Sequence, residues 1–540
     1  MTTRPIRFYH RGQVTEVSDA APTRSVLDWL REDARCTGTK EGCNEGDCGA
    51  CTVVIGSLAA PADRQAVRGL VLETVNACIQ FLPTLDGKAL FTVEDLKRQA
   101  RNGGLHPTSD DKLHPVSDDK LHPVRDDKLH PVSDDKLHPV QRAMVDCHGS
   151  QCGFCTPGFV MSLWSAYEHH QANATRPTRQ QLADELSGNL CRCTGYRPIL
   201  DAGQRMFDLA PVQLDTTPVI AALQQLASEQ TSGATFEYAA GAAFHAPRRL
   251  ETLAALREQL PKAQLLAGST DVGLWVNKQL RDLGDIIYLG DVEALKRIES
   301  REDGLWIGAA ASLESAWRAL AETWPTLTDM WLRFASPPIR HAGTMGGNVA
   351  NGSPIGDSAP VLMALDAVVE LRRGERVRRL PLDAFYVDYM KNHLETGEFV
   401  QAILIPKLPA ARQVRAYKIS KRFDCDISAL CAAFTIELDG DSVREVRLVY
   451  GGLAAVVKRA AAAEAALHGK PWSADRVAAA QAALAQDFKP LSDMRASAAY
   501  RLQVAGNLLQ RFWLETRTAG ALPASVTSVW NVMPHDVGIA

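Results

Sequence analysis

The chain has 540 residues, 46% of them hydrophobic and 23% charged, and both values are typical of globular proteins. Its 59 Lys and Arg residues nearly balance its 63 Asp and Glu residues, and the net charge of −4 argues against binding to nucleic acid or to an anionic membrane. No apolar stretch reaches the roughly 18 residues of a membrane span and the amino end shows no signal peptide, so we expect a cytoplasmic protein of about three to four domains.

Cysteine is distributed unevenly along the chain. Cys425 and Cys431 stand apart from the other ten, and we interpret them as small buried apolar side chains. Disulfides are one possible use of the others, but a long chain without an export signal meets reducing conditions, where clustered thiols more often bind metal. The ten clustered cysteines are Cys36, Cys43, Cys48, Cys51, Cys78, Cys147, Cys152, Cys155, Cys191 and Cys193.

The first 95 residues have the alternation that is typical of strands. Residues 6–9, 52–55 and 91–93 are rich in β-branched and aromatic side chains, whereas residues 25–31 carry an apolar helical face. We expect a small mixed sheet crossed by one helix.

An eight-residue repeat, DDKLHPV followed by S, R or Q, runs from Asp110 to about Gln141, after a degenerate start at Leu105-His106-Pro107. We assign residues 96–140 to the segment that contains it. Each copy has one proline, two acids and only two aliphatic residues, which cannot build a core. Metal binding by the histidines is the alternative, but the proline after each histidine favours extended backbone, which keeps successive imidazoles apart. We therefore expect a solvated linker. The histidines concerned are His106, His114, His122, His130 and His138.

Residues 141–210 have helical periodicity. Thr178 and Gln181 have the spacing of a capping box, Gly188 is placed to end that helix, and Pro198 opens another. The next segment, 211–234, is polar, and we interpret it as an irregular second linker.

The remaining residues alternate strands and helices. Alanine-rich stretches at 460–484 and 496–514 predict helices towards the carboxyl end. The tail after Gly520 has no pattern that we can explain physically.

A first group of cysteines has the spacing C-x4-C-x2-C with one more cysteine downstream, which is typical of a plant-type 2Fe-2S site. Gly42, Gly46 and Gly49 permit the left-handed turns and close backbone approach that such a loop needs. Zinc is the alternative, although structural zinc sites usually use paired C-x2-C knuckles. The predicted ligands are Cys43, Cys48, Cys51 and Cys78.

A second group consists of a C-x2-C pair and a C-x-C pair, each at an expected helix boundary. Helix amino ends favour thiolates, and a helical bundle can bring two such turns together. The C-x-C pair is unusual for zinc, which favours a second 2Fe-2S cluster. The predicted ligands are Cys152, Cys155, Cys191 and Cys193, with Cys36 and Cys147 outside both groups.

Two turns rich in glycine, serine and threonine lie next to apolar strands, at 265–273 and 344–357. Successive backbone N–H groups in such turns can bind a pyrophosphate, although neither turn has the G-x-G-x-x-G pattern. Tight turns within a sheet are the alternative.

Three segments, KEGCNEGDCGACT, LHPVQRAMVDCHGSQCGFCTPGF and NLCRCTGYRPI, occur in this order. They resemble the iron–sulfur portion of the molybdenum hydroxylases, the family of xanthine dehydrogenase and aldehyde oxidase, and the resemblance runs from Arg4 to about Trp513. It implies that the second cysteine group holds the cluster nearer molybdenum and the first group the cluster nearer a flavin.

The resemblance also implies a multidomain α+β fold. Its parts are a β-grasp ferredoxin-like domain, a helical-bundle 2Fe-2S domain, a two-part FAD-binding domain of the vanillyl-alcohol-oxidase kind and an α+β C-terminal flavoprotein domain. The expected division is 1–95, ferredoxin-like; 96–140, linker with the repeat; 141–210, helical 2Fe-2S domain; 211–234, linker; 235–410, FAD-binding domain; 411–520, flavoprotein domain; and 521–540, tail.

For the flavin, the resemblance implies a pyrophosphate loop at 265–272, a ribose contact at Asp357 and a positive charge from Lys418. The alternative for Lys418 is a surface lysine, and Tyr389, placed near flavin and NAD by the resemblance, is alternatively a core tyrosine. The implied FAD residues are Leu265, Leu266, Ala267, Gly268, Ser269, Thr270, Asp271, Val272, Phe334, Thr344, Met345, Gly346, Gly347, Asn348, Asp357, Val400 and Lys418.

The resemblance implies an electron-transfer subunit with no catalytic residue of its own. Because the sequence stops where larger relatives continue into a molybdopterin-binding region, we expect a separate molybdopterin-binding large subunit in an α2β2 heterotetramer. Two 2Fe-2S clusters and FAD would carry electrons to NAD while hypoxanthine and xanthine are oxidised to urate. The alternatives are the same role in an aldehyde or aromatic-heterocycle hydroxylase, and a regulatory redox sensor.

Overall fold

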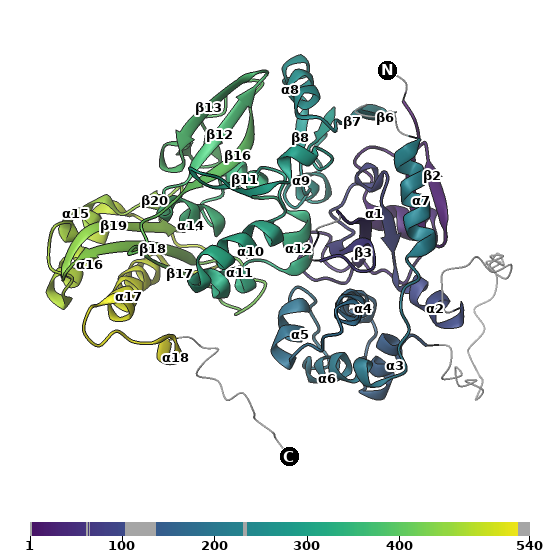
Figure 1. Cartoon of the computed structure of the whole chain (residues 1–540), viewed down its shortest axis with the longest axis horizontal. Helices are drawn as coiled ribbons and strands as arrows, with labels where there is room; N and C mark the ends of the chain where they lie inside the picture. The colour runs from purple at the N-terminus through teal and green to yellow at the C-terminus, as the bar shows by residue number, and fades with distance from the viewer. Residues whose placement is uncertain (1–2, 61–62, 64, 103–136, 230–234, 528–540) are drawn as a thin grey trace. The chain divides into compact units, whose positions relative to one another are not determined.

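The computed structural model describes residues 3–60, 63, 65–102, 137–229 and 235–527 (Figure 1). The repeat from Asp110 to Ser133 and the end of the tail lie outside these residues. The chain forms two compact units, Met1–Ala246 with Ser269–Tyr288 and Pro337–His341, and Pro247–Gly268 with Leu289–Ser336 and Ala342–Ala540.

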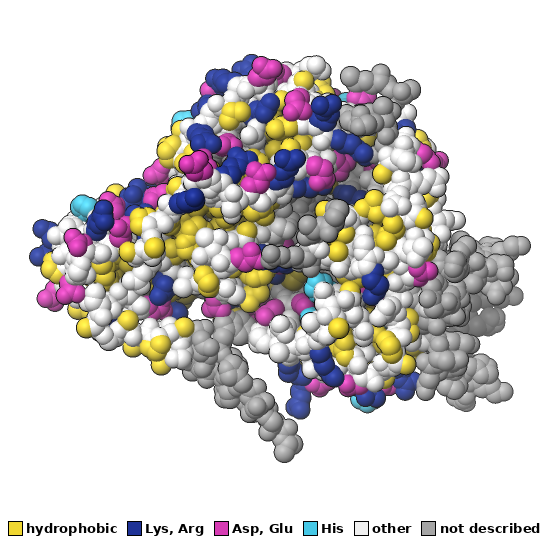
Figure 2. All heavy atoms as spheres, in the orientation of Figure 1, with side chains coloured by type: hydrophobic (Ala, Val, Ile, Leu, Met, Phe, Trp, Pro, Cys, Tyr) yellow, Lys and Arg dark blue, Asp and Glu magenta, His cyan; other side chains and the backbone are white. Residues whose placement is uncertain are grey.

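Charge is mixed on the visible face of the molecule (Figure 2). On the face drawn in Figure 2, Lys and Arg side chains are interspersed with Asp and Glu side chains, in keeping with the small net charge. Among the described residues, no helix is both long and apolar enough to cross a membrane.

The first unit opens with a five-stranded mixed sheet of order β2-β1-β5-β3-β4, in which β1 runs parallel to β5. The helix α1 (Val26–Asp28) begins at Ser25, whose hydroxyl accepts the Asp28 N–H, and continues as a π-helical turn. The strands are β1 (Ile6–His10), β2 (Gln13–Val17), β3 (Thr52–Leu58), β4 (Leu70–Asn76) and β5 (Ala89–Phe91).

The expected strand at 91–93 is only partly correct. Strand β5 ends at Phe91, and α2 (Val93–Asn102) begins two residues later. The reason is local, because the Asp95 carboxylate accepts the Thr92 N–H at 2.8 Å and starts the helix.

Four helices follow in the same unit. The His138 imidazole and Gln141 form a capping box at the first, and Thr178 and Gln181 form the expected capping box at the third. Trp164 and Tyr167 are fully buried at the centre of the bundle. The helices are α3 (Pro139–Asp146), α4 (Thr156–Ala172), α5 (Arg179–Glu185) and α6 (Arg197–Arg205).

The segment 211–234 is not irregular throughout, as we expected it to be. It contains the helix α7 (Thr217–Ser228), which buries Val219, Leu223 and Leu226. These apolar residues are spaced by four and three positions, the pattern of one helical face, and that face packs into the hydrophobic core of the first unit.

The first unit is completed by segments from later in the sequence. They are β6 (Phe236–Ala240), β7 (Ala242–Ala246), α9 (Val272–Asn277), β9 (Ile286–Tyr288) and residues 337–341 of α12 (Pro337–Ala342).

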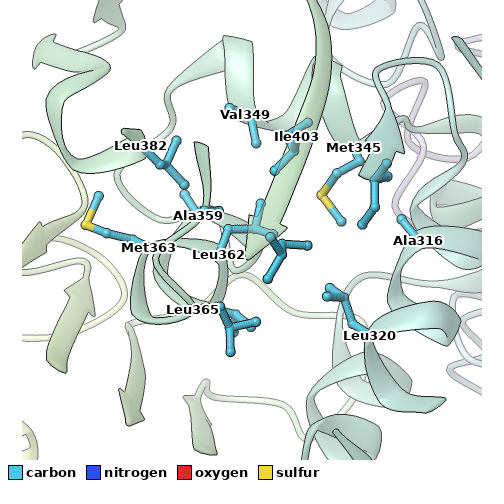
Figure 3. Packing of buried hydrophobic residues seen from close by; sticks show 14 of the residues in the cluster. Ala316, Leu320, Met345, Val349, Ala359, Leu362, Met363, Leu365, Leu382 and Ile403 are labelled. Atoms are coloured by element: carbon cyan, nitrogen blue, oxygen red, sulfur yellow. The ribbon is translucent and has the colours of Figure 1, made fainter. Parts of the chain in front are cut away.

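The second unit contains an antiparallel sheet of order β10-β11-β16-β12-β13. Leu320, Met345 and Leu362, from three different helices, point into one core with Ile403 of β16 (Figure 3). The strands are β10 (Ile298–Ser300), β11 (Gly304–Gly308), β12 (Val368–Arg373), β13 (Arg376–Pro381) and β16 (Phe399–Pro406).

The second unit also contains helices and shorter strands that are not part of this sheet. They are α8 (Leu250–Gln259), β8 (Gln264–Leu266), α10 (Leu313–Thr323), α11 (Thr328–Arg333), α13 (Met345–Asn351), α14 (Ser358–Ala364), β14 (Tyr386–Asp388) and β15 (Lys391–Asn392).

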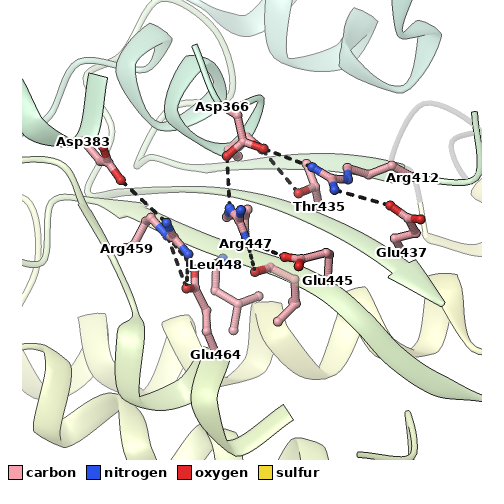
Figure 4. A network of polar contacts seen from close by, with 12 residues as sticks. Asp366, Asp383, Arg412, Thr435, Glu437, Glu445, Arg447, Leu448, Arg459 and Glu464 are labelled. Atoms are coloured by element: carbon pink, nitrogen blue, oxygen red, sulfur yellow. Dashed lines mark hydrogen bonds and ion pairs between the residues drawn. The ribbon is translucent and has the colours of Figure 1, made fainter. Parts of the chain in front are cut away.

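A second antiparallel sheet, of order β17-β18-β19-β20, packs against the alanine-rich helices. Asp366 accepts hydrogen bonds from Arg412 and from Arg447 of β19, each at 3.0 Å (Figure 4). The elements are β17 (Gln413–Ile419), β18 (Leu430–Asp439), β19 (Ser442–Gly451), β20 (Lys458–Arg459), α15 (Ala461–Leu467), α16 (Ala474–Asp487), α17 (Ala498–Thr516) and α18 (Ala524–Thr527).

Candidate iron–sulfur and flavin sites

The four cysteines of the first group converge on one loop at the end of the five-stranded sheet. The Cys51 and Cys78 sulfur atoms are 3.3 Å apart. The Cys43 sulfur accepts the backbone N–H groups of Asp47 and Cys48, both at 3.4 Å. Thiolate sulfur atoms that accept backbone N–H bonds are a common feature of iron–sulfur sites.

Glycines make this loop possible. Gly46 and Gly49 have φ angles of 80° and 70°, which side chains of L-residues rarely adopt. A Cβ at Gly42 would lie 2.7 Å from the Cys48 sulfur. The loop therefore needs glycine at all three positions, as the sequence predicts.

The electrostatics of the first group call for a cation. Hydrogen bonding from Cys48 and Cys78 lowers the pKa of Cys43 far below its ordinary value, and contact with Cys43 raises the pKa of Cys48 and Cys78. One thiolate thus suppresses ionisation of its neighbours. Bound positive metal ions would stabilise several thiolates together in this loop.

The second group lies at the ends of two helices of the bundle. The Cys193 and Cys152 sulfur atoms are 3.3 Å apart and both side chains are exposed. Cys155 is the N-cap residue of α4, and Cys191 is buried.

Thr194 controls the ionisation of Cys191. Burial opposes ionisation, but hydrogen bonds from the Thr194 hydroxyl and backbone N–H prevail and lower the pKa of Cys191 to about 7. The Cys191 backbone N–H in turn donates to the Tyr196 hydroxyl at 3.0 Å. This turn is preorganised to present a thiolate.

The cysteines of each group lie close to one another. No group of three or more His, Cys, Asp or Glu side chains in the described ranges is arranged around a single ion. A 2Fe-2S cluster takes two protein ligands on each of two irons, so two groups of four thiols match the ligand number of two such clusters. None of the twelve cysteines, all within the described residues, forms a disulfide.

Contacts within the first unit join the two cysteine loops, and these were not apparent from the sequence. The Leu190 N–H, next to Cys191, donates to the Cys48 carbonyl at 3.0 Å. Asn189 donates to the Gly49 carbonyl at 3.1 Å. A Cβ at Gly158 of α4 would lie 2.1 Å from that same carbonyl, so glycine permits this approach.

Two of the remaining cysteines test our apolar interpretation. Cys431 is fully buried in β18, as expected. The expectation is wrong for Cys425, which is half-buried in a loop with a φ angle of 49°. Turn geometry, which the sequence did not reveal, keeps Cys425 out of the core.

The turns predicted to bind a flavin come close together within the second unit. A Cβ at Gly268 would lie 1.8 Å from the Ala342 carbonyl oxygen, and a Cβ at Gly346 would lie 2.4 Å from the Ala309 side chain. The Thr344 hydroxyl accepts the Gly347 N–H at 3.1 Å and begins α13. Glycine at these two positions therefore permits the close approach of the backbone segments that form the turns.

Asn348 carries a polar atom that lacks a partner. Its side-chain oxygen is buried and accepts no hydrogen bond from any described residue. An ideal Cβ built at Gly356 would lie 3.9 Å from this oxygen, so Asn348 lies beside the segment that leads into Asp357. A buried unpaired oxygen is costly, and a bound FAD with its hydroxyl and amide groups would satisfy it.

Asp357 and Lys418 come together as a buried ion pair. Lys418 Nζ donates to Asp357 Oδ2 at 2.6 Å and to the Ser428 hydroxyl at 2.8 Å, and Ser428 donates to Asp357 Oδ1 at 2.6 Å. Lys418 is 5% exposed, so the alternative of a surface lysine is wrong. Ser428 was missed, because nothing in its local sequence marks it.

The other residues predicted to bind flavin lie in different parts of the fold. Phe334 is buried against Trp317, and Val400 is buried in β16. The predicted loop divides between the units: residues 265–268 belong to the second and 269–272 to the first, where Asp271 is the N-cap residue of α9. Tyr389 is 62% exposed, so the alternative of a core tyrosine is wrong.

Four protein families match the chain. Residues 8–81 match a 2Fe-2S iron–sulfur cluster binding domain, and 128–204 match a [2Fe-2S] binding domain. Residues 236–408 match the FAD binding domain in molybdopterin dehydrogenase, and 415–516 the CO dehydrogenase flavoprotein C-terminal domain.

Similar proteins include xanthine dehydrogenases. That of Emericella nidulans is 28% identical over 94% of this chain and 38% of its own length, and that of Calliphora vicina is 28% identical over 83% and 34%. The chain thus spans about a third of the length of these curated relatives. Among solved structures, CO dehydrogenase from Oligotropha carboxidovorans is 27% identical, covers 50% of this chain and 94% of its own, and has a TM-score of 0.47. Quinoline 2-oxidoreductase from Pseudomonas putida 86 is 22% identical, covers 52% of this chain and 98% of its own, and has a TM-score of 0.48.

The chain belongs to the molybdenum hydroxylase family and carries two 2Fe-2S binding domains and an FAD-binding domain. The predicted multidomain α+β fold is confirmed, as are the expected cofactors, two 2Fe-2S clusters and FAD.

Proposed function

We propose that the chain is the electron-transfer subunit of a xanthine dehydrogenase. It receives electrons from a molybdopterin-binding partner subunit that oxidises hypoxanthine and xanthine to urate, and it delivers them to NAD. The observation that carries this proposal is that two cysteine nests, joined by the bond from Leu190 to Cys48, occur in one chain with a flavin domain.

Each cofactor supplies chemistry that the others lack, since iron–sulfur clusters accept one electron at a time, a flavin handles one or two, and NAD accepts only hydride. The chain's own residues hold these groups at fixed positions. Cys43, Cys48, Cys51 and Cys78 ligate one cluster, and Cys152, Cys155, Cys191 and Cys193 ligate the other. In this proposal Gly268, the start of α13 and Asn348 contribute to binding FAD.

Exposure of the second cysteine group supports a partner subunit. Cys152 and Cys193 are exposed, and the neighbouring Phe154 and Tyr196 are 47% and 39% exposed. A cluster held here would meet water, whereas large apolar side chains favour burial against another protein. We propose that the molybdopterin-binding subunit covers this surface in an α2β2 assembly.

The purine substrate is supported by the similar proteins, several of which are named xanthine dehydrogenase. NAD as acceptor is part of the same proposal. In this proposal Tyr389, which is 62% exposed, is accessible to the nicotinamide of NAD.

The test is purification of the native complex, with iron, flavin and molybdenum quantified and xanthine-dependent NADH formation measured. Urate and NADH formed in equal amounts would support the proposal. If the complex oxidises an aldehyde or a heterocycle but not xanthine, the chain has the same electron-transfer role in a hydroxylase for a different substrate. A chain that carries clusters and flavin but reduces no dye with NADH would overturn NAD as its partner.

A further inference from the structure

Two adjacent side chains at the end of α9 bind the backbone of the first cysteine group. Asn277 Nδ2 donates to the Cys78 carbonyl at 2.7 Å, and Lys278 Nζ donates to the Cys43 carbonyl at 2.5 Å. Asn277 also donates to the Asn44 side-chain oxygen at 3.2 Å. All of these residues belong to the first unit.

Close packing of α9 fixes these contacts. A Cβ at Gly273 would lie 2.8 Å from the carbonyl of Ile79, the residue after Cys78, so glycine lets the helix approach the chain there. Asn277 follows one helical turn later. The contacts bridge 199 and 235 positions of sequence, so they hold the loop through tertiary structure and not through local geometry.

The positive charge of Lys278 also affects the reduction potential of a cluster bound in this loop. Its ammonium group lies against the loop, and its partner Glu45 is 3.8 Å away with both side chains more than two-fifths exposed. A cluster gains one negative charge on reduction, so a nearby positive charge stabilises the reduced form. Exposure to water weakens this effect but does not abolish it.

We propose that Asn277 and Lys278 are positioning residues of the 2Fe-2S site formed by Cys43, Cys48, Cys51 and Cys78, and that Lys278 raises its reduction potential. The proposal rests on the ligand assignment in the proposed function. A higher potential makes this cluster a better electron acceptor. Asn277 and Lys278 lie within the residues that match the FAD-binding domain, shortly after the predicted pyrophosphate loop at 265–272.

The test is a redox titration of the full chain, with the two clusters followed separately by electron paramagnetic resonance. Lys278→Met should lower the potential of one cluster and leave the other unchanged. The expected shift is about threefold to tenfold in the one-electron reduction equilibrium, tenfold being about 59 mV. Lys278→Arg keeps the charge and should retain the potential.

Lys296→Met is the matched control. Lys296 is 40% exposed and paired with Glu293, much as Lys278 is 42% exposed and paired with Glu45, but it lies in the second unit. Asn277→Leu removes the amide donors at similar volume and should change the resonance line shape of the same cluster.

Two failures are distinguishable. If the unaltered chain shows only one kind of cluster, the ligand assignment and the proposed function fail. If the unaltered chain shows two kinds of cluster, the proposed function stands. If the reduction potentials of both clusters are then the same in Lys278→Met as in Lys296→Met, the inference about Lys278 is overturned.

Discussion

Lys418 Nζ lies 2.6 Å from Asp357 Oδ2, and the two side chains are only 2% and 4% exposed. Ser428 bonds to both, which closes a three-membered polar cluster inside the second unit. A buried ion pair of this kind contributes little over an apolar pair, but removing one partner strands the other charge.

Lys418→Met should therefore lower the free energy of unfolding by about 3 to 5 kcal/mol, because Asp357 keeps only Ser428 as a donor. Denaturant unfolding of the flavin-loaded chain measures this. Lys296→Met, at an exposed ion pair, should cost less than about 1 kcal/mol. Equal stability of the two variants would contradict a buried charged pair.

Removing a ligand from one cysteine group should abolish that cluster and leave the iron of the other group in place. Cys51→Ala and Cys152→Ala should each remove about half of the iron, because each cluster needs four thiolates. Iron analysis and resonance spectra of the reduced variants measure this. Cys36→Ala and Cys147→Ala are the controls and should keep all of the iron. Loss of iron in these controls would show that the ligand sets are misassigned.

Gly268→Ala should disturb the predicted flavin site. The new Cβ would lie 1.8 Å from the Ala342 carbonyl oxygen, so the backbone must move at a cost of about 1 to 3 kcal/mol. Flavin content after purification should fall. Gly506→Ala in α17 is the control: its Cβ would meet only Gln481 of α16 at ordinary contact distances, and helix propensity predicts a gain of up to about 1 kcal/mol. Full flavin content in Gly268→Ala would contradict the site.

His138 makes the stability of the helical bundle depend on pH. Its Nδ1 accepts the Val140 N–H at 3.3 Å, and burial lowers its pKa to about 3. Because the unfolded chain takes up a proton near pH 6.5 and the folded chain does not, stability is complete above that pH and is lost as pH falls towards 3.

Relative to His138→Asn, which keeps an N-cap acceptor, the unaltered chain should lose about 2 kcal/mol between pH 6.5 and pH 5. Unfolding midpoints across this range measure the difference. Parallel pH profiles for the two proteins would mean that His138 is not held neutral.

The sequence predicted those features that depend on residues close together in the chain. Cysteine spacing predicted both ligand groups, and Thr178 with Gln181 predicted a helix start that the structure confirms. It failed for Ser428 and Asn277, whose roles depend on partners 71 and 199 positions away. The helix α7 was missed because polar residues flank it on both sides and because packing on the first unit stabilises it.

The central claim is that two separate cysteine nests hold iron in one chain with a flavin. Anaerobic purification followed by metal and flavin analysis, and by electron paramagnetic resonance after reduction, tests it most directly. The account predicts about four irons and about one FAD per chain, with two distinct 2Fe-2S signals. Zinc in place of iron, or a single kind of paramagnetic cluster, would contradict it.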